Sequence, residues 1–237
     1  FNLVEKLARR VKLPLPQIQG RRTRAGGRGE RMHWAKTMQQ AARQDGDVLR
    51  LPRMQRKPQA LPLLILVDIS GSMERYARLL LAFLHQATRG TPRQIFAFGT
   101  DLTDINHAFK LRDTDDMLTE ASHQIKDFAG GTQLGKSLAH LRGNFAKKLT
   151  GRRTVVLLIS DGLDTGTAET LDSELVWLKR HTRSLLWLNP LLRFEGYAPI
   201  ATGASVLNRH VNGMLAIHNL SRLEELASAL NKLLKIK

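Results

Sequence analysis

Five oxygen-bearing side chains, in three short motifs, have the types and spacing of a binding site for a small hard cation. They are Asp68, Ser70, Ser72, Thr132 and Asp161. Carboxylate and hydroxyl oxygens are the ligands that Mg²⁺ and Mn²⁺ prefer, and Mg²⁺ keeps water in the octahedral positions that a protein leaves open. The residue types therefore predict a Mg²⁺ or Mn²⁺ site.

The positions of these motifs place them at the ends of probable strands. The Asp-x-Ser-x-Ser motif follows the apolar run 63–67, and Asp161 follows the apolar run 155–159. Fully apolar runs of this length are typical of strands buried on both faces. Gly71 lets the backbone between the two serines turn sharply. Two carboxylates that act partly through water leave a divalent cation under-neutralised, so we expect it to attract a Glu or Asp of a partner protein.

From residue 61 onward the sequence alternates between strand and helix patterns. The expected strands are 63–67, 94–98, 102–105, 154–159, 184–188 and 214–217, and the expected helices are 73–88, one beginning at 114, 134–148, 170–181 and 221–234. This alternation predicts an α/β fold, a doubly wound and mostly parallel sheet with helices on both faces. Ligands of such sheets bind outside the carboxyl ends of the strands, where the strand order reverses.

Charge divides the chain into two regions. The formal net charge is +16, and residues 1–60 hold 15 Lys and Arg against 4 Asp and Glu. The remaining 177 residues hold 22 against 17. We therefore expect residues 1–60 to be a basic, partly flexible extension, with helical segments at 1–11 and 34–43, and residues 61–237 to be the folded domain.

Composition also limits the class of protein. There is no cysteine, which excludes disulfides and zinc–thiolate sites and fits a cytoplasmic protein. No apolar run approaches the roughly 20 residues of a membrane-spanning helix. The Gly-x-Ser-x-Gly motif of a serine hydrolase is absent, and the histidines show no ligand spacing. Trp177 and Trp187 are expected in the core, and Asp101 and Asp164 as solvated loop carboxylates.

From about residue 61 onward the chain resembles the von Willebrand factor A (VWA) domain, whose fold is Rossmann-like, with its metal-ion-dependent adhesion site (MIDAS). Asp68, Ser70 and Ser72 match the first element of that site, Thr132 matches its threonine and Asp161 its distal aspartate. The resemblance is closer still to the CoxE-like branch. The sequences Trp-Leu-Asn-Pro at 187–190 and His-Asn-Leu at 218–220, with the basic segment before the first strand, carry it.

The resemblance implies a protein-binding module rather than an enzyme. CoxE-like proteins are expected to work in the cytoplasm beside a MoxR-type AAA+ ATPase. Their implied task is the maturation of a client enzyme, or metal insertion into it, for example a molybdenum-containing dehydrogenase. Under this interpretation the five site residues hold the metal, and the partner supplies a Glu or Asp to it.

A second pattern favours a different class, a P-loop NTPase. Residues 130–137, Gly-Gly-Thr-Gln-Leu-Gly-Lys-Ser, match GxxxxGK[ST], and 155–161 resembles the apolar strand and aspartate that support Mg²⁺ in such enzymes. A P-loop must follow a buried strand, however, and the polar segment 121–128 has the spacing of a helix. The context therefore makes Lys136 a solvated residue in the first turn of a helix.

The basic segment 21–57 leaves further partners open. It could bind nucleic acid through phosphates, although it lacks interleaved aromatic residues and a recognition motif. It could instead meet an acidic protein surface or an anionic membrane face, or be a solvated linker. Among these binding roles an acidic protein partner is favoured.

Overall fold

The computed structural model describes residues 17–48, 50–125, 131–149, 151–193 and 198–216, which belong to two compact units. One unit is Gln17–Ala60, and the other holds everything described from Leu61 onward. The expected helices at 1–11 and 221–234 and the stretch 218–220 lie outside the described residues. No helix in the described part combines the length and apolar character that a membrane crossing needs.

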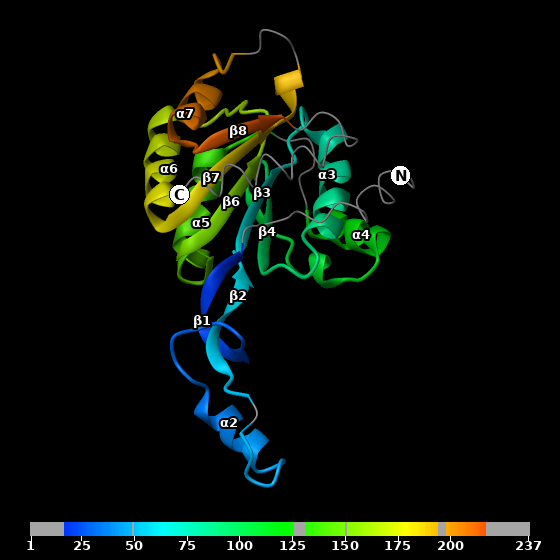
Figure 1. Ribbon diagram of the computed structural model, residues 1–237. Coiled ribbons are helices and arrows are strands. Elements are labelled where there is room, and N and C mark those ends of the chain that lie inside the picture. The colour runs from blue at the N-terminus through cyan, green and yellow to red at the C-terminus, as the bar shows by residue number, and fades with distance from the viewer. Residues whose placement is uncertain (1–16, 49, 126–130, 150, 194–197, 217–237) are drawn as a thin grey trace. The chain divides into compact units, whose positions relative to one another are not determined.

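A six-stranded sheet forms the centre of the larger unit (Figure 1). Its strands are β3 (Leu63–Asp68), β4 (Arg93–Phe98), β5 (Leu102–Asp104), β6 (Gly151–Ile159), β7 (Thr182–Asn189) and β8 (Gly213–Ala216). In space their order is β5-β4-β3-β6-β7-β8, and every pair is parallel except β4 with β5. From β3 in the middle, the chain moves outward to β5 and then returns to the other side of β3. The order therefore reverses between β3 and β6, and the doubly wound, mostly parallel fold is confirmed.

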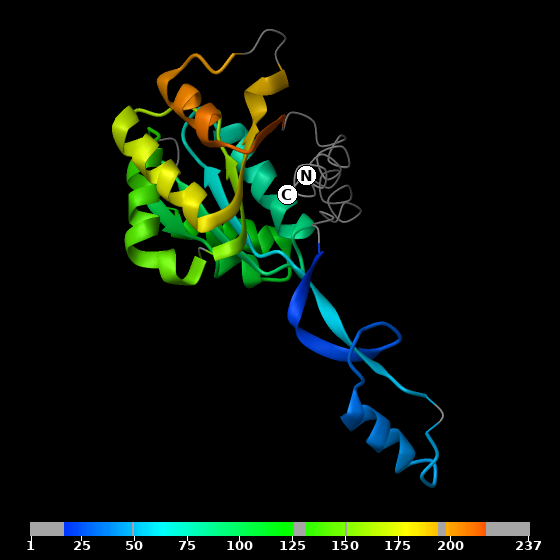
Figure 2. The ribbon, with the colours of Figure 1, turned by 60° about the vertical axis from the view of Figure 1, so that its left-hand side comes forward.

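Helices cover both faces of this sheet (Figures 1 and 2). They are α3 (Glu74–Ala87), α4 (Thr114–Gln124), α5 (Leu134–Leu149), α6 (Ala168–His181) and α7 (Thr202–His210), with short 3₁₀ turns η1 (Ala108–Lys110) and η2 (Pro190–Arg193). Helices α3 and α4 lie together on one face, and α5, α6 and α7 on the other. The sequence did not predict α7, because its nine residues are too few to show a clear apolar period.

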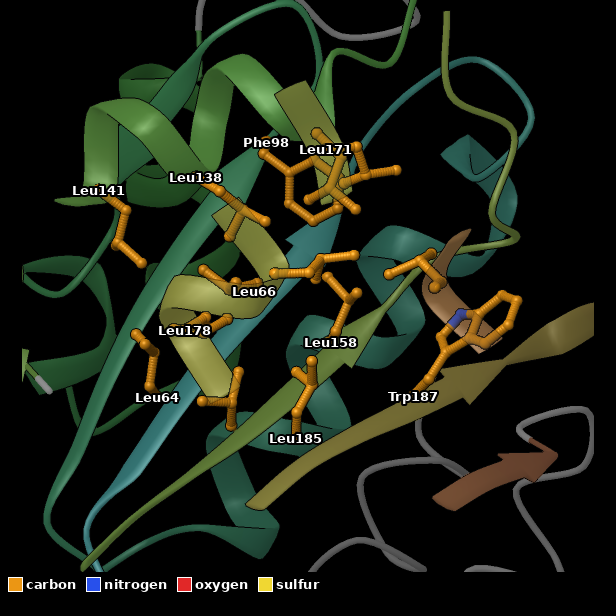
Figure 3. Close-up of a cluster of buried hydrophobic side chains, with 14 of the residues drawn as sticks. Leu64, Leu66, Phe98, Leu138, Leu141, Leu158, Leu171, Leu178, Leu185 and Trp187 are labelled. Atoms are coloured by element: carbon orange, nitrogen blue, oxygen red, sulfur yellow. The ribbon is translucent and has the colours of Figure 1, made fainter. Parts of the chain in front are cut away.

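Alternation along the strands creates two apolar layers. Leu64 and Leu66 of β3 face α5 and α6, as do Leu158 and Leu185 of the neighbouring strands (Figure 3). Complete burial of one such side chain stabilises the fold by about 1.5–3 kcal/mol. Trp187 is fully buried at the same layer, as expected. This apolar layer thus holds β3, β6 and β7 in place relative to one another, and with them the carboxyl ends of these strands.

The smaller unit is a two-stranded antiparallel ribbon that carries a helix. Strand β1 (Gln17–Gly26) pairs with β2 (Arg53–Ala60), with a register shift between Gln19 and Thr23, and α2 (Trp34–Ala41) lies between them in sequence. The arginine-rich segment 21–29, expected to be flexible, is therefore mostly strand, and so is much of the basic lead-in 50–58. Both strands are mostly exposed, and they lack the apolar pattern by which a strand is recognised.

Candidate metal centre

The first motif forms a tight turn at the carboxyl end of β3. The Ser70 N–H donates to Asp68 Oδ1 at 2.9 Å, and the hydroxyl oxygens of Ser70 and Ser72 lie 3.3 Å apart. The N–H of Met73, the N-cap of α3, donates to the Ser70 carbonyl. Asp68 and Ser70 are buried, whereas Ser72 is exposed. The turn therefore groups three oxygen-bearing side chains at an edge that solvent can reach.

Ser160 connects this turn to the loop after β6. Its hydroxyl donates to Asp68 Oδ2 at 2.7 Å and accepts from the Gly162 N–H at 3.0 Å. Its carbonyl accepts from Trp187 Nε1 at 2.9 Å, so the buried indole holds the loop from below. Sequence reasoning did not single out Ser160. Its position directly after an apolar strand was the one signal that could have assigned it a role.

Asp161 lies beside Asp68 on the other side of the point where the strand order reverses. It is buried, and its Oδ1 accepts the Leu163 N–H at 3.0 Å. The negative charge of Asp161 contributes to the raised pKa of Asp68. The structure therefore brings together both predicted carboxylates and both predicted serines.

Thr132 belongs to the same edge through its backbone. Its carbonyl accepts both the N–H and the hydroxyl of Thr165, at 2.9 and 2.8 Å. The next residue, Gln133, donates its N–H to the Gly99 carbonyl just beyond β4. Thr132 is thus held between the end of β4 and the loop after β6. Its own hydroxyl makes no hydrogen bond to another described residue, which leaves that oxygen available to a ligand.

The two carboxylates make an electrostatically demanding pair. Burial raises the pKa of Asp68 above its ordinary value, hydrogen bonds from Ser70 and Ser160 oppose that rise, and the negative charge of Asp161 adds to it. Within the described ranges no Lys, Arg or His forms an ion pair with either carboxylate. A cation placed among these oxygens would compensate both charges.

The donor set fits a hard cation and not a soft one. No group of three or more His, Cys, Asp or Glu among the described residues could hold a metal ion. A cation at this edge would therefore need hydroxyl oxygens to complete its coordination, and two serines and a threonine lie in the three motifs. Mg²⁺ and Mn²⁺ accept such ligands, and soft ions prefer sulfur.

Two neighbouring carboxylates behave differently from each other. Asp101 is an exposed loop carboxylate, as expected, and its Oδ1 lies 2.7 Å from Lys136 Nζ. Asp164 was expected to be solvated as well, but its Oδ1 accepts the Leu134 N–H at 3.0 Å and so caps α5. That contact joins residues 30 positions apart, which local sequence does not reveal.

The P-loop interpretation fails on its context. The segment before residue 126 is helix α4, Thr114–Gln124, and not a buried strand. Lys136 lies exposed in the first turn of α5 and pairs with Asp101. The described residues before 126 thus lack the buried strand that a P-loop follows.

Comparison with known proteins agrees with the geometry. The family described as “VWA domain containing CoxE-like protein” matches residues 4–223. A von Willebrand factor type A structure from Catenulispora acidiphila has a TM-score of 0.52 at 15% identity and covers 76% of this chain and 44% of that chain. Proximal thread matrix protein 1 from the mussel byssus, with a zinc occupied MIDAS motif, has a TM-score of 0.51 at 17% identity and covers 74% and 48%.

At these identities the two structures show a shared fold. The chain spans less than half the length of each solved chain. Comparison with curated protein sequences gave no match.

Proposed function

The chain belongs to the CoxE-like family of VWA-domain proteins, and from that membership we propose that its carboxyl-edge loops form a metal-dependent protein-binding site. The hydroxyls of Ser70, Ser72 and Thr132 are the direct ligands of Mg²⁺ or Mn²⁺. Asp68 and Asp161 bind the ion directly or through water, and they also orient the hydroxyls. The zinc occupied MIDAS motif of the mussel protein, which has a similar fold, supports a divalent ion at this edge.

One observation carries the proposal: two buried carboxylates lie together at an open sheet edge, with no basic side chain paired to them among the described residues. Such an arrangement is costly without a positive charge. A divalent ion supplies that charge and remains incompletely neutralised by the protein. Its open position then takes a Glu or Asp of the partner, which makes protein binding depend on the metal.

The wider role follows from the family resemblance. We propose a non-enzymatic adaptor that acts in the cytoplasm with a MoxR-type AAA+ ATPase, in maturation of a client enzyme or metal insertion into it. A molybdenum-containing dehydrogenase is the client type that the resemblance suggests. In this role the ATPase supplies mechanical work, and the metal edge recognises an acidic residue on a partner.

Titration calorimetry with Mn²⁺ tests the site itself. Wild-type protein should bind one ion, and Asp68→Asn and Thr132→Val should each weaken binding at least about tenfold, because losing a metal ligand costs at least as much as losing a residue that orients one. Asp101→Asn is the matched control, since this exposed carboxylate pairs with Lys136. No ion uptake by the wild type, or equal uptake by Asp68→Asn, would refute the proposal.

Co-purification tests the partner. The ATPase should remain bound to the wild type in Mg²⁺ and be released by EDTA. Asp68→Asn should not retain it under either condition. If the ATPase stays bound in EDTA and to Asp68→Asn, it contacts another part of the chain.

A further inference from the structure

Large exposed apolar side chains have an uneven distribution in this protein. Among the described residues there are seven of them, and five belong to the unit 17–60: Trp34, Met38, Val48, Leu51 and Met54. The two in the α/β unit are Leu163, 48% exposed, and Ile200, 85% exposed. Single exposed apolar residues are ordinary. Leu163 differs because it lies next to Asp161, and Ile200 because it lies just before a helix turn that packs on the same loop.

Leu163 is part of the loop that carries the second carboxylate. It follows Asp161 by two residues, and its N–H donates to Asp161 Oδ1 at 3.0 Å. Its neighbour Gly162 has φ of +83° and is packed against Trp187 and Ala204. The backbone on this side of Leu163 is thus fixed by buried contacts, while its side chain remains half exposed.

Ile200 reaches the same corner from the start of α7. The first turn of α7 packs on the loop after β6, residues 160–164, which we call the metal loop. A Cβ placed on Gly203 would lie 2.6 Å from the Asp164 Cβ and 2.8 Å from the Gly162 carbonyl oxygen. Ile200 precedes Gly203 by three residues, a stretch that spans at most about 11 Å. Leu163 and Ile200 therefore belong to segments that meet on the α7 side of the centre.

The opposite side of the centre is polar. There the exposed Asp101 and Lys136 form an ion pair beyond the end of β4. A partner that offers a carboxylate to the ion therefore meets an apolar surface on one side and a charged pair on the other. Because the two sides differ, the residues next to the partner's carboxylate must fit an apolar surface on one side and a charged pair on the other.

We propose that Leu163 and Ile200 form an apolar shelf that recognises a large apolar side chain next to the partner's metal-binding carboxylate. This rests on the proposed metal-dependent binding and adds the partner's chemistry to it. The partner segment is a Glu or Asp with Leu, Ile, Phe or Met one or two positions away. In an extended segment, side chains two positions apart point the same way, about 7 Å from each other. One segment can thus reach the ion and the shelf together.

Short peptides with one central glutamate in a Gly/Ser background test the shelf on the full chain. In one series Leu, Ile or Phe stands one or two positions from the glutamate, and in the other Ser replaces it. With Mg²⁺ present, wild-type protein should bind the apolar series about tenfold more tightly, the value expected for burying one such side chain. Leu163→Ser and Ile200→Ser should each reduce that preference several-fold.

Controls separate the shelf from the metal. Both variants should bind Mn²⁺ with wild-type affinity in calorimetry, because the Leu163 N–H that donates to Asp161 belongs to the backbone and is kept by serine. Leu51→Ser, at 55% exposure in the other unit, is the matched surface control and should keep the full preference.

Each other result has a definite meaning. Glutamate-dependent, EDTA-sensitive binding that is equal for both series refutes the shelf and leaves the metal-dependent function intact. Apolar preference that persists in EDTA or in Asp68→Asn refutes the coupling between shelf and ion. An absence of Mg²⁺-dependent binding to any glutamate peptide refutes the function on which the shelf rests.

Discussion

Gly162 is the residue on which the second carboxylate loop depends most directly. Its φ is +83°, a conformation that side chains other than glycine rarely adopt. A Cβ there would also lie 2.8 Å from Trp187 Cζ2 and 3.0 Å from the Ala204 Cβ. The residue therefore meets a backbone requirement and a packing requirement at once, between Asp161 and the exposed Leu163.

A pair of glycine substitutions can separate these two requirements. Gly90 also has a positive φ, +78°, but nothing lies within 4 Å of the position of its Cβ. Gly90→Ala should therefore cost only the backbone strain, about 1–2 kcal/mol. Gly162→Ala should cost that strain and about 1–3 kcal/mol more for the crowding. Urea denaturation measures both, and equal costs would show that the loop relaxes around the methyl group.

At this scale the sequence predicts the oxygen-bearing side chains better than the residues that support them. The Asp-x-Ser-x-Ser spacing is local, so it predicts that Asp68 and its serines lie together, as they do. Ser160 contacts Asp68 across 92 residues of chain, and Thr165 contacts Thr132 across 33. Contacts of that range come from strand order, which no local pattern records. The supporting residues were therefore found only in the folded chain.

Helices α3 and α4 are joined by a buried polar network centred on His85. Its Nε2 lies 2.9 Å from the Leu111 carbonyl and its Nδ1 3.2 Å from the Thr114 hydroxyl, which also accepts from Gln86 Nε2. A carbonyl only accepts, so Nε2 carries the proton and Nδ1 accepts from Thr114. Burial lowers the pKa of His85, and the positive charge of Arg93 lowers it further, against the opposing effect of the Leu111 carbonyl.

This lowered pKa makes stability depend on mild acid. Below about pH 6.5 the unfolded chain binds a proton at His85, while the folded chain does not until the pH reaches its lower pKa. This contribution to stability is therefore fully present above about pH 6.5 and falls as the pH drops, by up to about 1.4 kcal/mol per pH unit. Denaturation curves at several pH values should show a weaker pH dependence for His85→Gln.

His123→Gln is the control, since His123 is exposed on α4. It should reproduce the wild-type pH dependence between about pH 7 and pH 5. A wild-type slope retained in His85→Gln would mean that other groups cause it.

The helices and strands that could be predicted from the sequence are those with a clear apolar pattern. Strands β3 and β6 contain continuous buried runs, and the sequence motifs at their carboxyl ends are the ones that meet at the candidate metal centre. Helix α7 is short, yet its first turn supports the metal loop. Strands β1 and β2 are held by backbone hydrogen bonds with almost no buried side chain, so their sequence resembles that of a basic linker. The sequence pattern therefore indicates which strands are buried, and it does not reveal regular strands that are exposed.

The apolar core belongs to one unit of the molecule, and the other unit is small and strongly basic. Every buried apolar side chain of the described residues belongs to the unit from Leu61 onward. The unit 17–60 holds 11 Lys and Arg against 3 Asp and Glu, and its described residues bury only Gly20 and Thr37. A two-stranded ribbon without a core is marginally stable in water. The α/β unit therefore holds the stability of the protein.

Removing the ribbon tests this division of roles. Gln17 and Ala60 are paired partners at the base of the ribbon, so a short glycine linker can join them in place of residues 18–59. Because the excised residues contribute no apolar core, the shortened chain should unfold cooperatively, with a melting temperature within about 4 °C of the full chain, the shift expected for about 1 kcal/mol. Its Mn²⁺ affinity should be unchanged, since all five candidate ligands lie in the remaining unit. Circular dichroism melts and calorimetry measure both quantities. A shortened chain that melts without cooperativity or loses Mn²⁺ affinity would contradict this division of roles.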